Sequence, residues 1–330
     1  LATLTCGLAR NYEEMFAARF IIGVGEAAYG SVGIAVILSV FPARLRSTLS
    51  GSFLAGGVFG SVLGMGLGGA VAGQLGWCWS FFAMACFGLS LLAIFSLVVT
   101  EKRLDPERRH AALAAASRDM FQFRTLLPGL FSARSVIFAY VGNGLQLFIV
   151  GSVIAWMPSF LNREYGLPIP RASALAAAFV LLSGVGMIAC GAVADRLCRR
   201  APVRKFTMAI GISLATCVLL AIGFRLPPGT AQLVLLGFGI FLAAGTTGPS
   251  TAMVANVTHI SIHSTAFAAL SLANNLLGMA PGPVVTGALA DRWGLATAFQ
   301  VVPFVCLAAA LSFALGQRHY AADLERMRAP

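Results

Sequence analysis

The chain has 330 residues, of which 58% are hydrophobic and only 11% are charged, and its mean hydropathy is +0.85. A soluble domain usually carries about 25% charged residues, so this composition excludes an ordinary water-soluble protein. The net charge of +11 admits a nucleic-acid binder, and the position of the charges decides between that class and a membrane protein. The seven cysteines have no CxxC spacing, so neither a disulfide framework nor a metal site is indicated.

Nine apolar stretches are long enough to cross a bilayer, which takes roughly 20 helical residues. Proline and glycine mark the breaks between them, and Asn11 with Glu14 predicts a capping box where the first stretch begins. In chain order, the expected spans are residues 14–40, 47–73, 77–99, 135–160, 171–194, 204–224, 231–256, 263–290 and 296–315. The sequence therefore predicts an all-α polytopic membrane protein, surrounded by the lipid bilayer.

The Lys and Arg residues are distributed unequally between alternate loops. Seventeen of the 22 loop positions that carry a positive charge fall in one set of loops, and positive residues stay on the cytoplasmic side. We therefore expect the central loop, residues 100–134, and the tail, residues 316–330, to be cytoplasmic in a multi-pass protein of the plasma or inner membrane. This bias also accounts for the basic net charge without nucleic acid.

Two parts of the chain repeat one another with an offset of 217 to 218 residues. Arg46-Ser-Thr opens one span and His263-Ser-Thr opens another. The closing residues have the same spacing in both spans: Gly69, Gly73, Gly76 and Trp77 in the first, and Gly287, Asp291, Gly294 and Leu295 in the second. The offset places the equivalent of Leu1 late in the 204–224 span, so we expect about 80 residues, two and a half helices, to precede it. The parent would then have twelve spans in two halves.

The resemblance to a known family rests on residues 191–200, which read G-x-x-x-D-R-x-x-R-R. This segment resembles the cytoplasmic loop motif of the major facilitator superfamily, with Cys198 in place of the usual glycine. The resemblance implies two pseudo-repeated six-helix bundles. Residues 1–99 would form a partial N-terminal bundle, from the end of span three to span six, and residues 135–315 the C-terminal bundle of spans seven to twelve.

Three segments are similar to the spinster-like lysolipid transporters within that superfamily. They are R-x-x-x-G-V-G-E-A at residues 19–27, W-M-P-S-F-L at residues 156–161, and the N-L-L-G and Gly-Pro pair between residues 275 and 283. Organic-anion symporters of the same superfamily carry a similar Arg-to-Glu signature on span four. His263 stands where the spinster-like pattern usually has arginine.

Glu26 is the most informative single residue, because the other eleven acids fall at span ends or in loops. A carboxylate inside a membrane span is costly unless it is paired or protonated, which makes proton coupling or substrate binding the default hypothesis. Arg19 lies two turns away on the same helix face, within reach of Glu26 or of a shared ligand. The alternative is a packing ion pair that only joins two helices.

Other polar residues inside spans are candidates for a substrate cavity, because the resemblance places spans one, four, seven and ten around it. Asn and Gln inside a membrane also often do no more than bond neighbouring helices. The cavity candidates are Tyr29, Tyr140, Asn143, Gln146, Thr247, Asn274 and Asn275.

The resemblance also implies a cytoplasmic gate, in which the loop acid contacts a helix of the other half. The gate candidates are Asp195, Arg196, Arg199 and Arg200. By pseudo-symmetry Asp195 should meet the start of span five near Ser47 and Thr48, where free N–H groups and the helix dipole favour a negative charge.

These observations predict a secondary active transporter that moves a small organic or amphipathic solute by alternating access. An anionic solute is favoured because Arg19 supplies a cation, and Glu26 is the candidate proton carrier. We expect a monomer with no cofactor, no metal, no catalysis and no nucleic-acid partner. The alternatives are an organic-acid symporter or drug exporter of the same superfamily, a membrane receptor or scaffold, and a membrane-embedded enzyme.

Overall fold

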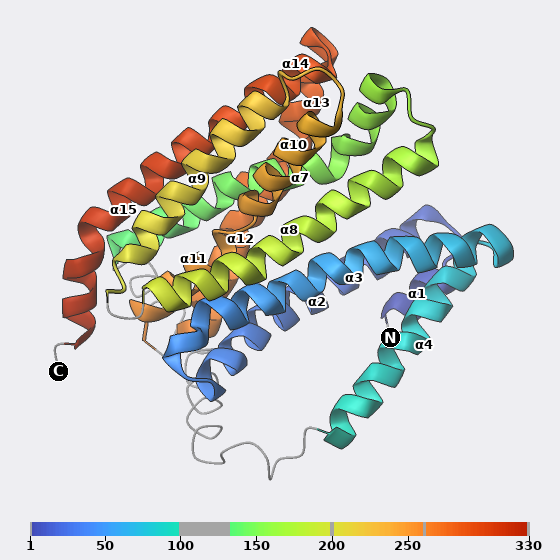
Figure 1. Ribbon diagram of the computed structural model, residues 1–330. Coiled ribbons are helices and arrows are strands. Elements are labelled where there is room, and N and C mark those ends of the chain that lie inside the picture. The colour runs from blue at the N-terminus through green and yellow to red at the C-terminus, as the bar shows by residue number, and fades with distance from the viewer. Residues whose placement is uncertain (1, 99–132, 199–200, 260–261, 329–330) are drawn as a thin grey trace.

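The structure is a computed structural model, and it describes residues 2–98, 133–198, 201–259 and 262–328. Every regular element in these ranges is a helix. In Figure 1 the helices from α7 to α15 form one bundle, α2 and α3 lie along one side of it, and α4 projects away. Nearly all of the expected central loop, residues 100–134, lies outside the described residues.

The N-terminal part of the chain forms four helices. Their bounds are α1 Ala2–Leu8, α2 Tyr12–Val40, α3 Arg46–Leu75 and α4 Trp77–Val98, with a short 3₁₀ turn at Ala43–Leu45 before α3. The capping box at the start of α2 is confirmed, because Asn11 Oδ1 accepts from Glu14 N at 2.8 Å. The carboxylate of Glu14 in turn accepts from Arg10 N at 2.8 Å.

The C-terminal part contains the other expected spans. The bounds are α7 Arg134–Tyr165, α8 Ile169–Leu197, α9 Arg204–Gly223, α10 Thr230–Ala243, α11 Thr247–Asn256, α12 His263–Asn274, η4 Asn275–Met279, α13 Pro281–Trp293, α14 Leu295–Val301, η5 Val302–Phe304 and α15 Val305–Arg328. Eight stretches of the described residues are long and apolar enough to span a membrane. The ninth, residues 263–290, is the one divided by η4.

Proline explains the interruptions. Pro249 in the first turn of α11 and Pro281 at the start of α13 have no N–H to donate to the preceding turn, so a regular helix cannot continue through them. Before Pro281 the chain adopts a π-helical segment, η4, in which Ala280 N donates to Asn275 O at 3.0 Å. The expected span 231–256 is therefore built from α10 and α11, and the expected span 263–290 from α12, η4 and α13.

The predicted repeat is visible in the backbone. α3 begins at Arg46 and α12 begins at His263, as the matching triplets predict. The two spans end at Gly76 and Gly294, which adopt positive φ values of 94° and 83° and nearly equal ψ values. Glycine suits both positions because side chains disfavour this backbone conformation.

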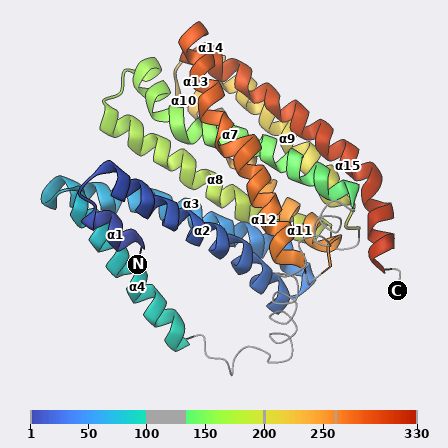
Figure 2. The same ribbon diagram turned by 180° about the vertical axis from the view of Figure 1, so that it is seen from behind.

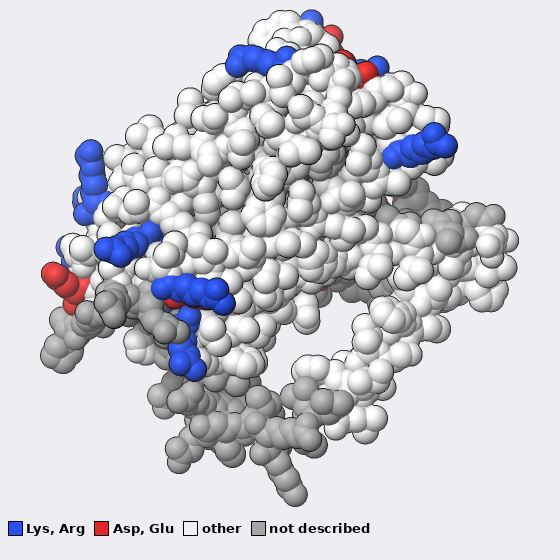
Figure 3. All heavy atoms as spheres, in the orientation of Figure 1, with Lys and Arg blue, Asp and Glu red and all other residues white. Residues whose placement is uncertain are grey.

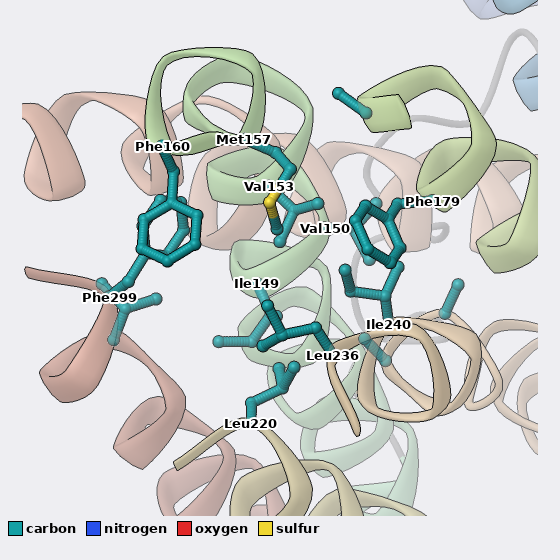
Figure 4. Packing of buried hydrophobic residues seen from close by; sticks show 14 of the residues in the cluster. Ile149, Val150, Val153, Met157, Phe160, Phe179, Leu220, Leu236, Ile240 and Phe299 are labelled. Carbon is teal, nitrogen blue, oxygen red and sulfur yellow. The ribbon is translucent and has the colours of Figure 1, made fainter. Parts of the chain in front are cut away.

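The core lies in the C-terminal bundle around α7. In Figure 4, Ile149, Val150, Val153 and Met157 of α7 lie among side chains from neighbouring helices, including Phe179, Leu220, Leu236, Ile240 and Phe299. The apolar windows of α2, α3 and α4 bury only 6 to 12% of their residues, against 50 to 72% for the C-terminal candidate spans. Most side chains of the N-terminal helices therefore face outward from the described part of the chain.

Charged side chains lie away from the middle of the face drawn in Figure 3. Figure 3 shows Lys and Arg gathered towards two opposite ends, with a wide uncharged belt between them. From behind, Figure 2 shows α12 and α13 running along α7, and α12 also packs against α2. An uncharged belt of helices is what a bilayer requires.

The boundary expected for the tail differs from the structure. Residues 316–330 were assigned to a tail, but α15 continues to Arg328. The residues beyond 315 are polar enough to leave the membrane, yet a helix does not end where hydrophobicity ends. Tyr320 and Asp323, in this extension, are both buried.

Candidate functional site

The best-organised polar site lies where α8 ends and α3 begins. Asp195, three residues from the end of α8, is only 6% exposed. Its Oδ1 accepts from Ser47 N at 3.1 Å, and its Oδ2 accepts from Thr48 N at 2.7 Å and from Thr48 Oγ1 at 2.8 Å. The predicted contact of Asp195 with the start of this span is confirmed. The carboxylate satisfies N–H groups that have no partner within α3 and lies at the positive end of the helix dipole.

Lys205, in the first turn of α9, completes this site. Its Nζ lies 3.3 Å from Asp195 Oδ1 and donates to Ser47 Oγ at 2.8 Å. The side chains of Lys205 and Asp195 are only 7% and 4% exposed. Two buried charges are tolerated when they are paired and their remaining hydrogen-bonding groups are satisfied, as they are here.

A second contact joins the start of α3 to the ends of two other helices. Arg46 Nη1 donates to Asn256 Oδ1 of α11 at 2.8 Å, and Asn256 Nδ2 donates to Tyr320 Oη of α15 at 3.1 Å. We call the two contacts together the latch, and the end of the molecule that holds them the latch end. The latch consists of Arg46, Ser47, Thr48, Asp195, Lys205, Asn256 and Tyr320.

Glycines allow the helix backbones of the latch to approach closely. A Cβ on Gly191 of α8 would lie 2.6 Å from Ser47 O, and one on Gly51 of α3 would lie 2.5 Å from Met187 O. A Cβ on Gly248 of α11 would also meet Ser47 O. The closed latch therefore depends on small residues on both sides of the contact.

The turn after α8 accommodates Cys198 without strain. Cys198 has a φ of −96° and a ψ of 9°, so the glycine of the family motif is not needed at this position. Burial raises the pKa of the Cys198 thiol, which keeps it neutral beside Lys205. No group of three metal-ligating side chains occurs in the described ranges.

The other gate candidates take no visible part in the latch. Arg196 is exposed at the end of α8. Arg199 and Arg200 lie outside the described residues. Lys205 supplies the positive charge that pairs with Asp195.

Arg19 and Glu26 are not brought together. Both side chains are exposed on α2, and within the described ranges no ion pair joins them. The Arg19 guanidinium instead lies 5.2 Å from the ring centre of Phe81 in α4. Glu26 is the middle residue of α2 (Tyr12–Val40), which agrees with its expected mid-span position.

The cavity candidates divide into buried and exposed residues. Asn143 accepts from Thr246 Oγ1 and donates to Asn274 Oδ1, both at 2.9 Å. Gln146 Nε2 donates to Thr216 Oγ1 at 3.2 Å, and Tyr140 Oη donates to Ala266 O at 3.0 Å. These bonds join helices within the C-terminal bundle, the alternative role for such residues.

The remaining candidates make local contacts. Thr247 is 3% exposed and its Oγ1 donates to Ala244 O in the break between α10 and α11. Tyr29 is 69% exposed and its ring lies 5.4 Å from that of Phe53. Asn275 is exposed and its Nδ2 donates to Ser271 O. Tyr29, Asn274 and Asn275 are thus the candidates with surface left for a solute.

A family model described as "Major Facilitator Superfamily" matches residues 1–280. The chain belongs to this superfamily. Its members are transporters and not enzymes, so the latch joins helices of two bundles in a membrane transport protein. The expected division of the chain places α1 to α4 in one bundle and α7 to α15 in the other.

Relatives of this facilitator include transporters of two kinds of solute. This chain is 24% identical over 333 residues to a D-galactonate transporter of Escherichia coli, and the match covers 96% of this chain and 76% of the relative. It is 23% identical over 300 residues to the sphingosine-1-phosphate transporter of Danio rerio, covering 85% of this chain and 58% of the relative. A probable galactarate/D-glucarate transporter of Escherichia coli, 26% identical over 61% of this chain, is covered over 49% of its length. The chain thus spans about half to three quarters of these relatives.

Solved structures confirm the fold. A bacterial homologue of the human lysosomal transporter Spinster, in an inward-facing and unoccupied conformation, superposes with a TM-score of 0.63 at 16% identity, covering 98% of this chain and 81% of that one. The proton:xylose symporter XylE superposes with a TM-score of 0.67 at 17% identity, covering 94% and 77%. The predicted all-α major facilitator fold is confirmed.

Several latch residues of this facilitator were missed from sequence. Lys205 carried a signal. A lysine one residue inside an apolar span either turns outward to water or needs a partner for its charge. Arg46 also carried one, since it opens a repeated triplet. Asn256 and Tyr320 carried none, because their partners lie more than 60 residues away in the chain.

Proposed function

We propose that this facilitator moves a small organic or amphipathic anion by alternating access, with the latch as its gate. The observation that carries the proposal is the set of bonds from Asp195 and Lys205 to Ser47 and Thr48, which joins α3 to α8 and α9 at one end of the molecule. Asp195 and Lys205 belong to the same bundle, so they remain paired when the bundles separate. Opening therefore breaks bonds to α3 without leaving a carboxylate unpaired.

An anionic solute is supported by the chemistry of the relatives and of α2. The names of two relatives, a galactonate and a sphingosine-1-phosphate transporter, each describe a solute with an acid group. Arg19 is a cation within an apolar span that pairs with no acid in the described ranges. A carboxylate or phosphate would supply the partner that Arg19 lacks.

Proton coupling would fall to Glu26. A carboxylate in the middle of an apolar helix changes between charged and neutral forms when its surroundings change, which is what a proton carrier requires. We expect Glu26→Gln, which keeps the shape and fixes the neutral form, to abolish accumulation driven by a proton gradient and to preserve exchange. Glu13→Gln, at the exposed start of the same helix, is the matched control.

Uptake into proteoliposomes tests the function directly. Galactonate and sphingosine-1-phosphate are offered separately, with and without an imposed proton gradient. We expect saturable uptake of one of them, enhanced by the gradient and impaired by Arg19→Ala. Uptake that the gradient does not change would exclude proton coupling, and uptake of neither anion would reject the solute class.

The latch end would face the cytoplasm, as the distribution of Lys and Arg predicts. An impermeant thiol reagent should modify a cysteine placed at exposed Arg196 in inside-out vesicles and not in intact cells. Modification in intact cells would reverse the assigned orientation.

A further inference from the structure

The end of α15 reaches into the latch, although it is far from the Asp195 site in sequence. Tyr320 is fully buried, and its ring centre lies 4.9 Å from that of Phe206 in α9. Its hydroxyl accepts the 3.1 Å bond from Asn256 Nδ2. Packing thus fixes the position of an oxygen atom next to Asn256, which binds Arg46.

Hydrogen-bonding chemistry determines which atom of Asn256 faces Arg46 and which atom faces Tyr320. A guanidinium only donates hydrogen bonds, so Asn256 must present its Oδ1 to Arg46 and its Nδ2 to the other side. Tyr320 Oη is an acceptor on that other side. Without it, the amide loses the bond that holds it in place beside Arg46, whose donor-only guanidinium selects the Oδ1 end.

Arg46 makes few other contacts that would hold its guanidinium in place. Its Nε is buried and has no hydrogen-bond partner, and no acid within the described ranges pairs with its guanidinium. Its bond to Asn256 is therefore the only one described that joins this charge to the C-terminal bundle. The position of the Asn256 amide therefore decides whether that bond forms.

We propose that Tyr320 is a positioning residue of the gate, which acts through Asn256 to hold Arg46 and keep the latch closed. This inference rests on the proposed function of the latch as a gate. It assigns the last helix a part in alternating access that is separate from the Asp195 site, because α15 touches the latch through a different residue of α3.

Ser50 provides a reporter of latch opening. It lies one turn into α3, is 1% exposed, and its Oγ has no partner among the described residues, so Ser50→Cys is a small change. A thiol reagent reaches this position when α3 separates from the C-terminal bundle. The experiment measures the labelling rate of this cysteine, above the background of the same protein with Ser50, in reconstituted membranes.

We expect Tyr320→Phe, which keeps the ring and its packing on Phe206, to raise the labelling rate about three- to tenfold. Asn256→Ala should raise it by a similar factor. The double variant should exceed neither single variant, because Tyr320 acts through Asn256. Tyr165→Phe is the matched control: Tyr165 Oη bonds Gln232 Oε1 at 2.5 Å, away from the latch.

Three outcomes would overturn the proposal. They are unchanged labelling in Tyr320→Phe, an equal rise in Tyr165→Phe, and independent, multiplying effects of Tyr320→Phe and Asn256→Ala. A loss of folded protein is detected by thermal unfolding of the same samples, and Tyr320→Phe is expected to unfold within a few degrees of the parent. If Asp195→Asn also left labelling unchanged, the gate itself would be refuted; a response of Asp195→Asn alone would refute only the role of Tyr320.

Discussion

Two carboxylates at the latch end bind the first turn of another helix, and they differ in what they join. Asp195 of α8 binds Ser47 and Thr48 of α3, across the two bundles. Asp323 of α15 binds Ser135 of α7, with Oδ2 accepting from Ser135 N at 3.0 Å and from Ser135 Oγ at 2.6 Å. They are 6% and 5% exposed.

Asp195 and Asp323 make similar hydrogen bonds, so the difference between them lies in which helices they join. Asp323 joins α15 to α7, which would move together under the proposed mechanism, so its bonds should stabilise the fold in every state. Asp195 joins helices of different bundles, so its bonds exist only while the latch is closed. Each carboxylate also benefits from the positive end of a helix dipole. Only Asp195 should therefore change the balance between closed and open states.

The largest expected effect distinguishes close packing within a bundle from close packing across the latch. A Cβ on Gly186 of α8 would overlap Phe241 O of α10, so Gly186→Ala should lower the free energy of unfolding by about 3 kcal/mol. Gly191→Ala forces α8 away from Ser47 of the other bundle. It should preserve thermal stability and raise labelling of Ser50→Cys about tenfold. Equal losses of stability in Gly186→Ala and Gly191→Ala would show that both glycines serve the fold and that neither is specific to the latch.

Neutralising Asp323 comes next. Asp323→Asn weakens two bonds to Ser135 and should lower the free energy of unfolding by about 1 to 2 kcal/mol, because bonds to a charged acceptor are the stronger ones. Labelling of Ser50→Cys should not change. A labelling increase would show that α15 and α7 move relative to one another during gating.

A Lys205 variant tests how the charges of Asp195 and Lys205 act together in the latch. Asp195→Asn leaves the Lys205 ammonium buried without its counterion, which favours the open, hydrated state. Adding Lys205→Met should therefore lower the labelling rate of the Asp195→Asn protein by about two- to fivefold. A further increase in the double variant would show that Lys205 closes the latch mainly through Ser47.

The smallest effect concerns the polar residues inside the C-terminal bundle. Thr246→Val removes the bond to Asn143 and should lower the free energy of unfolding by about 0.6 kcal/mol, a typical value inside a membrane. If these residues only join helices, the affinity for solute should be unchanged in an uptake assay. A large loss of affinity for solute would show that Asn143 lines the substrate cavity.

Sequence patterns predicted the elements of the fold because hydrophobic length and the repeated triplets are local signals. Arg46 and His263 begin α3 and α12, and Gly76 and Gly294 end the repeated spans, as expected. The interruptions at Pro249 and Pro281 have a signal in proline, but the π-helical form of η4 does not. Helix α15 continues beyond residue 315, where the expected span ends, because hydropathy marks the membrane boundary and not the end of a helix.

The candidate site was only partly predictable. The bond from Asp195 to Ser47 and Thr48 followed from the family motif together with the internal repeat. Its counterion Lys205 and the Arg46–Asn256–Tyr320 contact depend on how separate helix ends meet in space, which no spacing in the chain records. For Arg19 and Glu26, helical spacing places both on one face, but each side chain can turn to a different neighbour, and Arg19 turns to Phe81.

The most direct test of the account measures the distance between α3 and α8 at the latch end. Spin labels are placed at Arg44, just before α3, and at Arg196, at the end of α8, both of which are exposed. We expect the closed protein to show a short distance, Asp195→Asn to add a longer one, and Asp323→Asn to leave the distribution unchanged. An unchanged distribution in Asp195→Asn would contradict the central claim, because Asp195 would then be a permanent helix cap like Asp323.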